Sequence, residues 1–170
     1  LIQSLVKLSR MESGIIAVHS EDTTITQMLE SIQQQVSVKA REKNITLSLC
    51  DTDLHVRCDS KWTVEALGNI VDNAIKYTAC GGNVQIKVEQ YSFFVKIDII
   101  DDGIGIEKEE IPKIFGRFYR SLSVADQPGV GIGLFLAREI IQTQKGYIKV
   151  TSKRGKGSTF SVFLPIAKKE

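Results

Sequence analysis

The sequence opens with apolar residues that recur at the spacing of a helix. Leu1, Leu5 and Leu8 are four and then three residues apart, which is typical of a helix packed in a bundle or a coiled coil. The pair Ser13-Gly14 ends this pattern. With 170 residues in all, we expect one domain of ordinary size preceded by this short helical element.

A second helical pattern runs from about residue 24 to residue 42. Thr24 and Gln27 have the spacing of a capping box, in which two side chains satisfy free backbone N–H groups at the start of a helix. The apolar positions of the expected core face are Ile25, Met28, Leu29, Ile32 and Val36.

Two more helices are expected, one over about 60–77 and one over about 132–144. Asp59 or Ser60 can cap the first of these, and Gly146 ends the second. The expected core face of the first consists of Leu67, Ile70, Val71 and Ala74.

Six short apolar runs are expected to be strands. Two precede the helix over 60–77, and the other four form two adjacent pairs. The predicted strands are 45–50, 54–58, 84–90, 93–100, 147–152 and 159–165. Adjacent strand pairs favour antiparallel pairing, so we predict an α+β fold: a two-layer α/β sandwich with a mixed, mostly antiparallel sheet and helices on one face.

The stretch between the predicted strand 93–100 and the helix over 132–144 is irregular. Pro112 lies near the start of a short helical piece at about 108–115. Residues 121–128 show no periodicity and few apolar side chains, which predicts a mobile loop.

Composition narrows the functional class by exclusion. The formal net charge of +2 is too small to indicate nucleic acid binding, and no apolar stretch approaches the roughly 20 residues that cross a bilayer. The start of the sequence lacks the features of a signal peptide, so we expect a cytoplasmic fragment.

Cys50, Cys58 and Cys80 are expected to be free thiols, although Cys50 and Cys58 could also meet across neighbouring strands.

The third expected helix carries an unusual polar stripe. Glu65, Asn69, Asn73 and Tyr77 recur every four residues, and Lys76 lies beside them. Asn is a poor helix former, so two stacked amides in mid-helix indicate either a tertiary role or tolerance at an exposed face. Amide oxygens beside a lysine are what a magnesium triphosphate requires, namely hard oxygen ligands for the metal and a positive charge for phosphate.

Two glycine-rich segments follow this helix. Asp101 begins the segment DDGIGI, where glycines let the backbone approach a ligand and a carboxylate can accept a hydrogen bond from an adenine amino group. The same Asp-Gly pair also marks an ordinary strand exit. Gly129, Gly131 and Gly133 open a helix whose free N–H groups can bind phosphate oxygens. No segment has the spacing of the dinucleotide fingerprint or of a P-loop.

Five sequence blocks occur in a familiar order between Glu65 and Pro165. They are EALGNIVDNAIKYT, DDGIGI, FGRFYR, GVGIGL and GKGSTFSVFLP. In this order they resemble the N, G1, F and G2 boxes and the final hairpin of the ATP-binding catalytic domain of sensor histidine kinases of two-component systems. LVKLSRMESG, from Leu5, is similar to the end of the second helix of the dimerisation and histidine-phosphotransfer domain.

The resemblance implies a gyrase-type, or Bergerat, ATP-binding fold for residues 15–170, with residues 1–14 as the end of the dimerisation and phosphoacceptor helix. It implies ATP and Mg²⁺ as ligands, with Asn73 and Asn69 holding the metal, and a flexible lid. The residues implied to bind ATP are Asn69, Asn73, Lys76, Tyr77, Asp101, Gly103, Gly105, Gly129, Gly131, Gly133, Leu134 and Thr159. The implied catalytic residues are Lys76, Arg117 or Arg120 at the triphosphate, and Glu65 at the position of a possible general base.

The phosphorylated histidine is expected outside this sequence. His19 and His55 are its only histidines, and neither lies in a phosphoacceptor motif, so the acceptor is expected upstream of Leu1. The implied partners are the protein's own dimerisation and histidine-phosphotransfer domain, a response regulator receiver domain and a second copy in a homodimer. The full-length protein is expected in the cell membrane, reached only through upstream regions, with this domain facing the cytoplasm.

Three other functions share the nucleotide-binding boxes. A gyrase-type ATPase and an anti-sigma serine kinase would use the same fold, and a non-catalytic module would bind nucleotide only as a signal. The LVKLSRMESG helix end and the F box disfavour the first two, and the intact N, G1 and G2 boxes disfavour the third.

Overall fold

The computed structural model describes residues 2–14 and 17–167. Its helices are α1 (Ile2–Glu12), α2 (Ile25–Glu42), α3 (Ser60–Tyr77) and α4 (Gly133–Thr143), with short 3₁₀ turns η1 (Ile111–Lys113) and η2 (Leu122–Val124). Its strands are β1 (Glu21–Thr24), β2 (Thr46–Leu49), β3 (His55–Cys58), β4 (Asn83–Gln90), β5 (Phe94–Asp101), β6 (Tyr147–Lys153) and β7 (Gly157–Pro165). All four predicted helices and all six predicted strands are therefore confirmed, and β1 is an addition.

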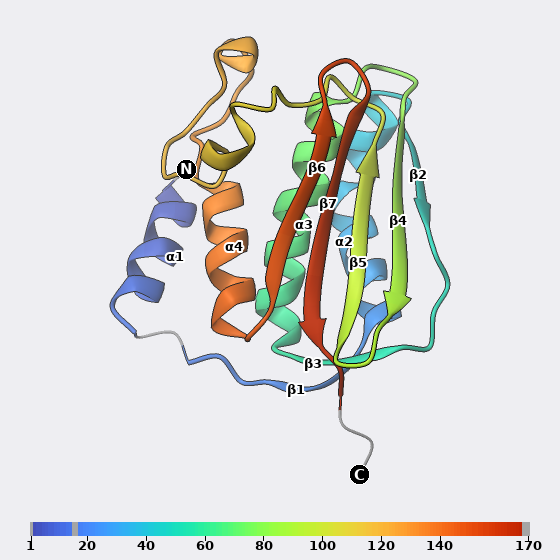
Figure 1. The fold of residues 1–170 in the computed structure, drawn as a ribbon, viewed down its shortest axis with the longest axis vertical. Coiled ribbons are helices and arrows are strands. Elements are labelled where there is room, and N and C mark those ends of the chain that lie inside the picture. Colours follow the sequence, from blue (N-terminus) through green and yellow to red (C-terminus); the bar gives the residue numbers. More distant parts are fainter. Residues whose placement is uncertain (1, 15–16, 168–170) are drawn as a thin grey trace.

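Five of the strands form one sheet in the order β2-β4-β5-β7-β6. β2 pairs with β4 in parallel, and the other three pairings are antiparallel. A separate antiparallel pair joins β1 to β3. Helices α2, α3 and α4 all lie on one face of the large sheet (Figure 1). The predicted two-layer α+β sandwich with a mixed, mostly antiparallel sheet is confirmed.

The core lies between this sheet and the helices. Every second residue of β5 and β7 is buried, because successive side chains of a strand point to opposite faces. These side chains pack in one cluster with the predicted core face of α3, where Leu67, Ile70, Val71 and Ala74 are all buried. Burying a Leu, Ile or Val side chain contributes about 1.5 to 3 kcal/mol, so this cluster holds α3 firmly on the sheet.

The starts of α2 and α3 are stabilised in different ways. The carboxylate of Asp59 accepts a hydrogen bond from the N–H of Trp62 at 3.1 Å, so the predicted cap of α3 is confirmed. Thr24 precedes α2 but makes no side-chain cap, so the predicted capping box is wrong. The N–H of Ile25 donates instead to the carbonyl oxygen of Leu54 at 3.1 Å, which replaces the local cap by a tertiary contact.

Helix α1 lies beside α4 at the edge of the molecule (Figure 1). Leu8 of the predicted apolar seam is buried against the domain, whereas Leu5 is 38% exposed. Ile2 and Val6 are also exposed, at 75% and 42%, and Leu1 lies outside the described residues. None of the helices in the described ranges combines the length and the apolar composition that a membrane crossing requires.

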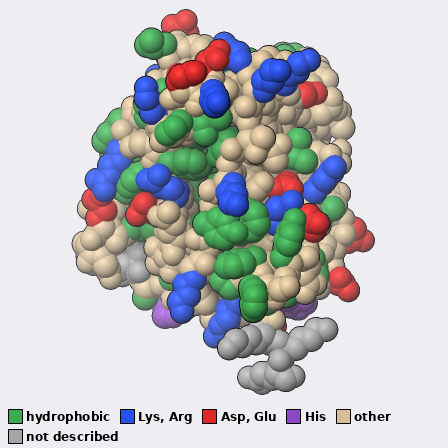
Figure 2. All heavy atoms as spheres, in the orientation of Figure 1, with side chains coloured by type: hydrophobic (Ala, Val, Ile, Leu, Met, Phe, Trp, Pro, Cys, Tyr) green, Lys and Arg blue, Asp and Glu red, His purple; other side chains and the backbone are tan. Residues whose placement is uncertain are grey.

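The outer face of the sheet carries an aromatic cluster. Tyr147 and Phe163 stack with their ring centroids 4.4 Å apart, and Phe94 meets Tyr147 edge-on at 5.5 Å. Figure 2 shows hydrophobic side chains gathered over the lower part of this face. The ammonium group of Lys149 lies 5.7 and 5.8 Å from the two stacked rings. These contacts join β5, β6 and β7 on the side that the helices do not cover.

The cysteines are free thiols, as the composition predicted. Cys58 belongs to β3 and Cys50 directly follows β2, and these strands lie in different sheets. The alternative that Cys50 and Cys58 meet across neighbouring strands is therefore wrong. Burial raises the pKa of the Cys58 thiol, so this group stays protonated.

Candidate functional site

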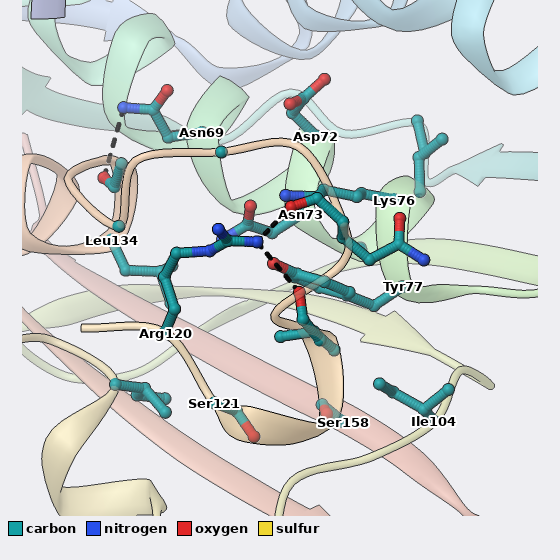
Figure 3. A pocket seen from close by; sticks show the side chains of 18 of the residues that line it. Asn69, Asp72, Asn73, Lys76, Tyr77, Ile104, Arg120, Ser121, Leu134 and Ser158 are labelled. Atoms are coloured by element: carbon teal, nitrogen blue, oxygen red, sulfur yellow. Dashed lines mark hydrogen bonds between the residues drawn. The ribbon is translucent and has the colours of Figure 1, made fainter. Parts of the chain in front are cut away.

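A cavity of about 810 Å³ lies between the C-terminal half of α3, the glycine-rich turn after β5 and the segment that leads into α4. Figure 3 shows how side chains from these three regions point into it. The predicted site residues that line the cavity are Asn69, Asn73, Lys76, Tyr77, Asp101, Gly105, Arg120, Gly129, Gly131, Gly133 and Leu134. The structure thus brings three sequence blocks that lie far apart in the chain into one site.

Helix α3 turns its polar stripe towards the cavity. The side-chain amide nitrogen of Asn69 donates to the carbonyl oxygen of Gly133 at 3.3 Å, which leaves the amide oxygen available to a ligand. The ammonium group of Lys76 donates to the carbonyl oxygen of Pro128 and lies 5.0 Å from the centre of the Tyr77 ring. This face therefore presents an amide oxygen, a cation and an aromatic ring to the same space.

Asp101 lies at the end of β5, with only 8% of its surface exposed. One carboxylate oxygen accepts a hydrogen bond from the N–H of Gly103 at 2.9 Å. Burial raises the pKa of the Asp101 carboxyl, and the backbone N–H groups of Gly103 and Ser158 oppose that rise. A buried carboxylate with acceptor capacity left can take a hydrogen bond from an amino group of a ligand.

Asp102 is engaged in a different contact from its neighbour. Its two carboxylate oxygens accept hydrogen bonds from the backbone N–H and the side-chain amide of Asn83, both at 2.8 Å. These hydrogen bonds lower the pKa of the Asp102 carboxyl. Asp102 therefore fastens the glycine-rich turn to the start of β4, and of the two acids only Asp101 lines the cavity.

Two glycines of the site are required by backbone geometry. Gly105 has a φ of 68°, and a side chain there would collide with the carbonyl oxygen of Lys153. Gly131 has a φ of 77°, and a Cβ atom there would lie 2.5 Å from the carbonyl oxygen of Tyr119. Since L side chains rarely adopt these conformations, the two turns can pack this closely only with glycine.

Helix α4 begins at Gly133, at the edge of the cavity. The preceding residue, Ile132, provides no side-chain cap, so the N–H groups of the first turn remain available to an anion. A Cβ atom on Gly129 would lie 2.8 Å from the ammonium nitrogen of Lys76, which shows how closely this segment approaches α3. The positive end of α4 and the polar stripe of α3 thus face the same volume.

Residues 121–128, which we call the lid, cover one side of the cavity. The guanidinium group of Arg120 donates to the carbonyl oxygens of Val124 and Ala125 at 3.0 and 2.9 Å, and also to that of Gln127. Figure 3 shows the Arg120 side chain extending into the cavity. Leu122, within the short turn η2, is 93% exposed, so the lid buries little of its own apolar surface.

Thr159 lies outside the lining, and Ser158 takes the expected place beside Asp101. In the pairing of β5 with β7, Ser158 is opposite Asp101 and Thr159 is opposite Ile100. Because side chains alternate along a strand, Ser158 faces the cavity and Thr159 faces the other side of the sheet. The sequence contained the signal, since every second residue after Ser158 in β7 is apolar and buried.

Glu65 and Arg117 contact α1 and do not line the cavity. A carboxylate oxygen of Glu65 lies 2.8 Å from the ammonium nitrogen of Lys7. Arg117 forms an ion pair with Glu12, and its guanidinium carbon lies 4.7 Å from the centre of the Phe135 ring. Gly103 also lies outside the lining, and its N–H donates a hydrogen bond to the carboxylate of Asp101.

The donors available for a metal are amide oxygens. Within residues 2–14 and 17–167, no three His, Cys, Asp or Glu side chains are grouped so that they could hold a metal ion. Asn69 and Asn73 offer hard oxygen atoms on the cavity face of α3. Such a donor set fits Mg²⁺, which takes few protein ligands and completes its shell with water and phosphate oxygens.

The chain matches the family described as histidine kinase-, DNA gyrase B-, and HSP90-like ATPase over residues 58–168. It is 31% identical to the sensor protein kinase PmrB of Pseudomonas aeruginosa, over 97% of the chain and 35% of that protein. It is 33% identical to the sensor histidine kinase WalK of Bacillus subtilis, over 97% of the chain and 28% of that protein. The chain therefore spans about a third of the length of these relatives.

The fold of the chain is also similar to that of a solved histidine kinase structure. The mycobacterial sensor histidine kinase MprB superimposes with a TM-score of 0.78 at 26% identity. The match covers 89% of this chain and 100% of that one. The layered arrangement that forms the cavity is thus shared with a histidine kinase.

Proposed function

Because the chain belongs to the histidine kinase-, DNA gyrase B-, and HSP90-like ATPase family and is the ATPase catalytic domain of a sensor histidine kinase, we propose that it transfers the γ-phosphoryl group of ATP to a histidine. The acceptor histidine belongs to the protein's own dimerisation domain and passes the phosphoryl group to an aspartate of a response regulator. The supporting observation is that Asp101, the amides of α3 and the N-terminus of α4 line one cavity.

The two ends of the cavity suit the two ends of ATP. Asp101 accepts a hydrogen bond from the adenine amino group, and Ser158 and Tyr77 line the same cavity. Lys76 and the uncapped N-terminus of α4 suit the triphosphate, because both present positive charge. A volume of about 810 Å³ lies within the range of roughly 300 to 1,000 Å³ that small-molecule sites occupy.

Asn73 and Asn69 would hold Mg²⁺ through their amide oxygens, and the metal supplies charge neutralisation at the triphosphate. In the described structure Lys76 and Arg120 donate to carbonyl oxygens of the lid. When ATP binds, these donors turn to phosphate oxygens, which are charged and therefore stronger acceptors. The lid then reorganises around the phosphates.

The transfer step needs positioning more than proton chemistry. A nitrogen of the neutral imidazole attacks the γ-phosphorus, the bond to the bridging oxygen of ADP breaks, and the imidazole proton leaves to solvent. Lys76 and Arg120 stabilise the charge on the transferred group. Glu65 takes no part as a base in this scheme, because it lies outside the cavity and contacts Lys7.

Residues 1–14 are, in this proposal, the end of the phosphoacceptor helix, and residues 15–170 are the catalytic domain. The exposed apolar side chains of Ile2 and Val6 on α1 suit packing within the helical bundle of a homodimer. We place the full-length protein in the cell membrane, with this domain on the cytoplasmic side.

The experiment that tests the function uses this chain with and without a phosphoacceptor domain. The chain alone should bind Mg-ATP without labelling itself, since neither His19 nor His55 lines the cavity. Addition of the two-helix dimerisation domain as a separate polypeptide should yield a label that is acid-labile and alkali-stable, as a phosphoramidate is. Labelling of His19 or His55, or an alkali-labile phosphoserine on the added domain, would contradict the proposal.

A further inference from the structure

The last turn of α3 is held by a lysine from the end of α2. The ammonium group of Lys43 donates to the carbonyl oxygens of Ile75 and Lys76, both at 2.8 Å, and of Thr78 at 2.5 Å. Lys43 directly follows α2 and also lines the cavity. The sequence pattern did not indicate this residue.

The remaining carbonyl groups of the turn also have partners. The carbonyl oxygen of Ala74 accepts the N–H of Thr78 at 3.1 Å and its hydroxyl at 2.7 Å. The carbonyl oxygen of Tyr77 accepts the N–H of Ile104, in the turn after β5, at 3.2 Å. Every carbonyl from residue 74 to residue 78 is therefore satisfied, and three of these five depend on Lys43.

The backbone explains why a side chain is needed here. Helices often end on a left-handed residue, usually glycine, which lets following N–H groups bond the last carbonyls. Thr78 instead has φ and ψ of −91° and 137°, so the chain leaves α3 in an extended conformation. The ammonium group of Lys43 takes the place of those N–H groups and places a positive charge at the negative end of the helix dipole.

This turn carries side chains of the proposed ATP site. Lys76 and Tyr77 belong to it, and Asn73 lies one turn earlier. Through its carbonyl oxygen, Tyr77 also holds Ile104, which lines the cavity beside Asp101. A displacement of the turn therefore moves residues on both the adenine side and the phosphate side of the cavity.

We propose that Lys43 is a positioning residue for nucleotide binding, which acts by fixing the last turn of α3 through its three carbonyl contacts. The inference rests on the proposed function, because it assumes that the cavity binds ATP. It goes beyond that function by assigning part of the affinity to a residue of α2, outside the recognised boxes.

The test compares Lys43→Met with Lys43→Arg in the 170-residue chain, with ATP and ADP affinities measured by calorimetry. Lys43→Met keeps the aliphatic stem but loses the donors, and should weaken both nucleotides about tenfold, the equivalent of one lost hydrogen bond to a charged group. Lys43→Arg retains a cation with several donors and should recover most of the affinity. Lys87→Met, on the exposed outer face of β4, is the matched control and should bind as the wild type does.

Three results would overturn the positioning role. A lower melting temperature with unchanged affinities would make Lys43 a stabilising residue only. A loss for ATP that far exceeds the loss for ADP would indicate direct contact with the γ-phosphate. If Lys43→Met does not fold, it is replaced by Lys43→Gln, whose shorter and uncharged side chain cannot make all three carbonyl contacts, and wild-type affinity in that variant would also count against the role.

A wild-type chain that binds neither nucleotide would instead contradict the proposed function itself. The two failures are therefore distinguishable, because one appears only in the Lys43 variants and the other already in the unmodified chain.

Discussion

The floor and the lid of the cavity are built on different principles. The floor consists of the last turns of α3, the end of β5 and the start of β7, where Asp101 and Ser158 are only 8% and 7% exposed. The carbonyl groups of its last helical turn are paired within the protein, as the contacts of Lys43 illustrate. The lid exposes 93% of Leu122 and is held to the site by Arg120 and Lys76.

Because of this difference, we expect the floor and the lid to contribute to ligand binding in different ways. A floor whose groups are already buried and held suits the flat, invariant adenine ring of the proposed ligand, because little ordering is required on binding. A lid held by exposed hydrogen bonds opens at low cost and can follow the changing triphosphate. Substitutions in the floor should therefore alter affinity strongly, and substitutions in the lid should alter mainly its motion.

The largest effect is expected from Asp101→Asn in the floor. The substitution replaces the charged group that we propose as the acceptor of the adenine amino group, and it should weaken ATP binding by about 1.5 to 3 kcal/mol, measured by calorimetry. Asp98→Asn is the matched control, because Asp98 lies on the same strand but faces the outer side, where it contacts Ser161 and Lys96. Unchanged ATP affinity in Asp101→Asn, with a normal circular dichroism spectrum, would contradict the assignment.

The thermal stability of Asp101→Asn shows whether weaker ATP binding reflects a lost contact or a damaged fold. The pKa of Asp101 is raised in the folded state, so this carboxyl contributes stability at low pH that is lost as pH rises through the raised pKa. Asp101→Asn lacks this loss and should therefore melt at a higher temperature than the wild type at neutral pH, which calorimetry measures. The advantage should vanish below the pKa of an unfolded aspartate.

A smaller effect is expected from Asn73→Ala, on the phosphate side of the floor. Removal of the proposed amide ligand should reduce the gain in ATP affinity that Mg²⁺ provides, while affinity without the metal changes little. Titrations with Mg²⁺ and with a chelator measure the two affinities. If the variant retains the wild-type difference between them, Asn73 is not a metal ligand.

The smallest effect is expected on the motion of the lid, from a substitution of Arg120, which directly precedes the lid and donates to its carbonyl oxygens. Arg120→Gln removes donors to the carbonyl oxygens of Val124 and Ala125, so amide exchange over residues 121–128 should become a few-fold faster without nucleotide. A non-hydrolysable ATP analogue should slow this exchange in the wild type. Equal exchange in the empty and the bound wild type would show that the lid does not close on the ligand.

Most of the fold was accessible from the sequence because it follows from periodicity. The helices and strands bury one face each, and apolar residues at helical or alternating spacing predict those faces. The strand β1, with the sequence EDTT, lacks such a pattern because three of its residues are not buried, so nothing indicated it. The pairing of β1 with β3 is decided by tertiary contacts.

The same limit applies to the site. The stripe of Asn69 and Asn73 was visible because it repeats at helical spacing along one element. Lys43 was not visible, because its role depends on where a second helix ends, and Thr24 was wrongly expected to cap because a distant carbonyl group serves α2 instead. Spacing along the chain predicts which face a side chain occupies, but not which partner another element brings to it.

The central position of β5 has a consequence for the synthesis of the protein. One neighbour of β5 in the sheet is β4, which directly precedes it in the chain. The other neighbour is β7, and the paired residues Asp98 of β5 and Ser161 of β7 are 63 positions apart. At translation rates of about 5 to 20 residues per second, β7 follows β5 off the ribosome after roughly 3 to 13 seconds. During this interval one edge of β5 is unpaired, and Asp101 lacks the N–H group of Ser158. The nascent chain therefore cannot complete the proposed nucleotide site before the hairpin of β6 and β7 has been made.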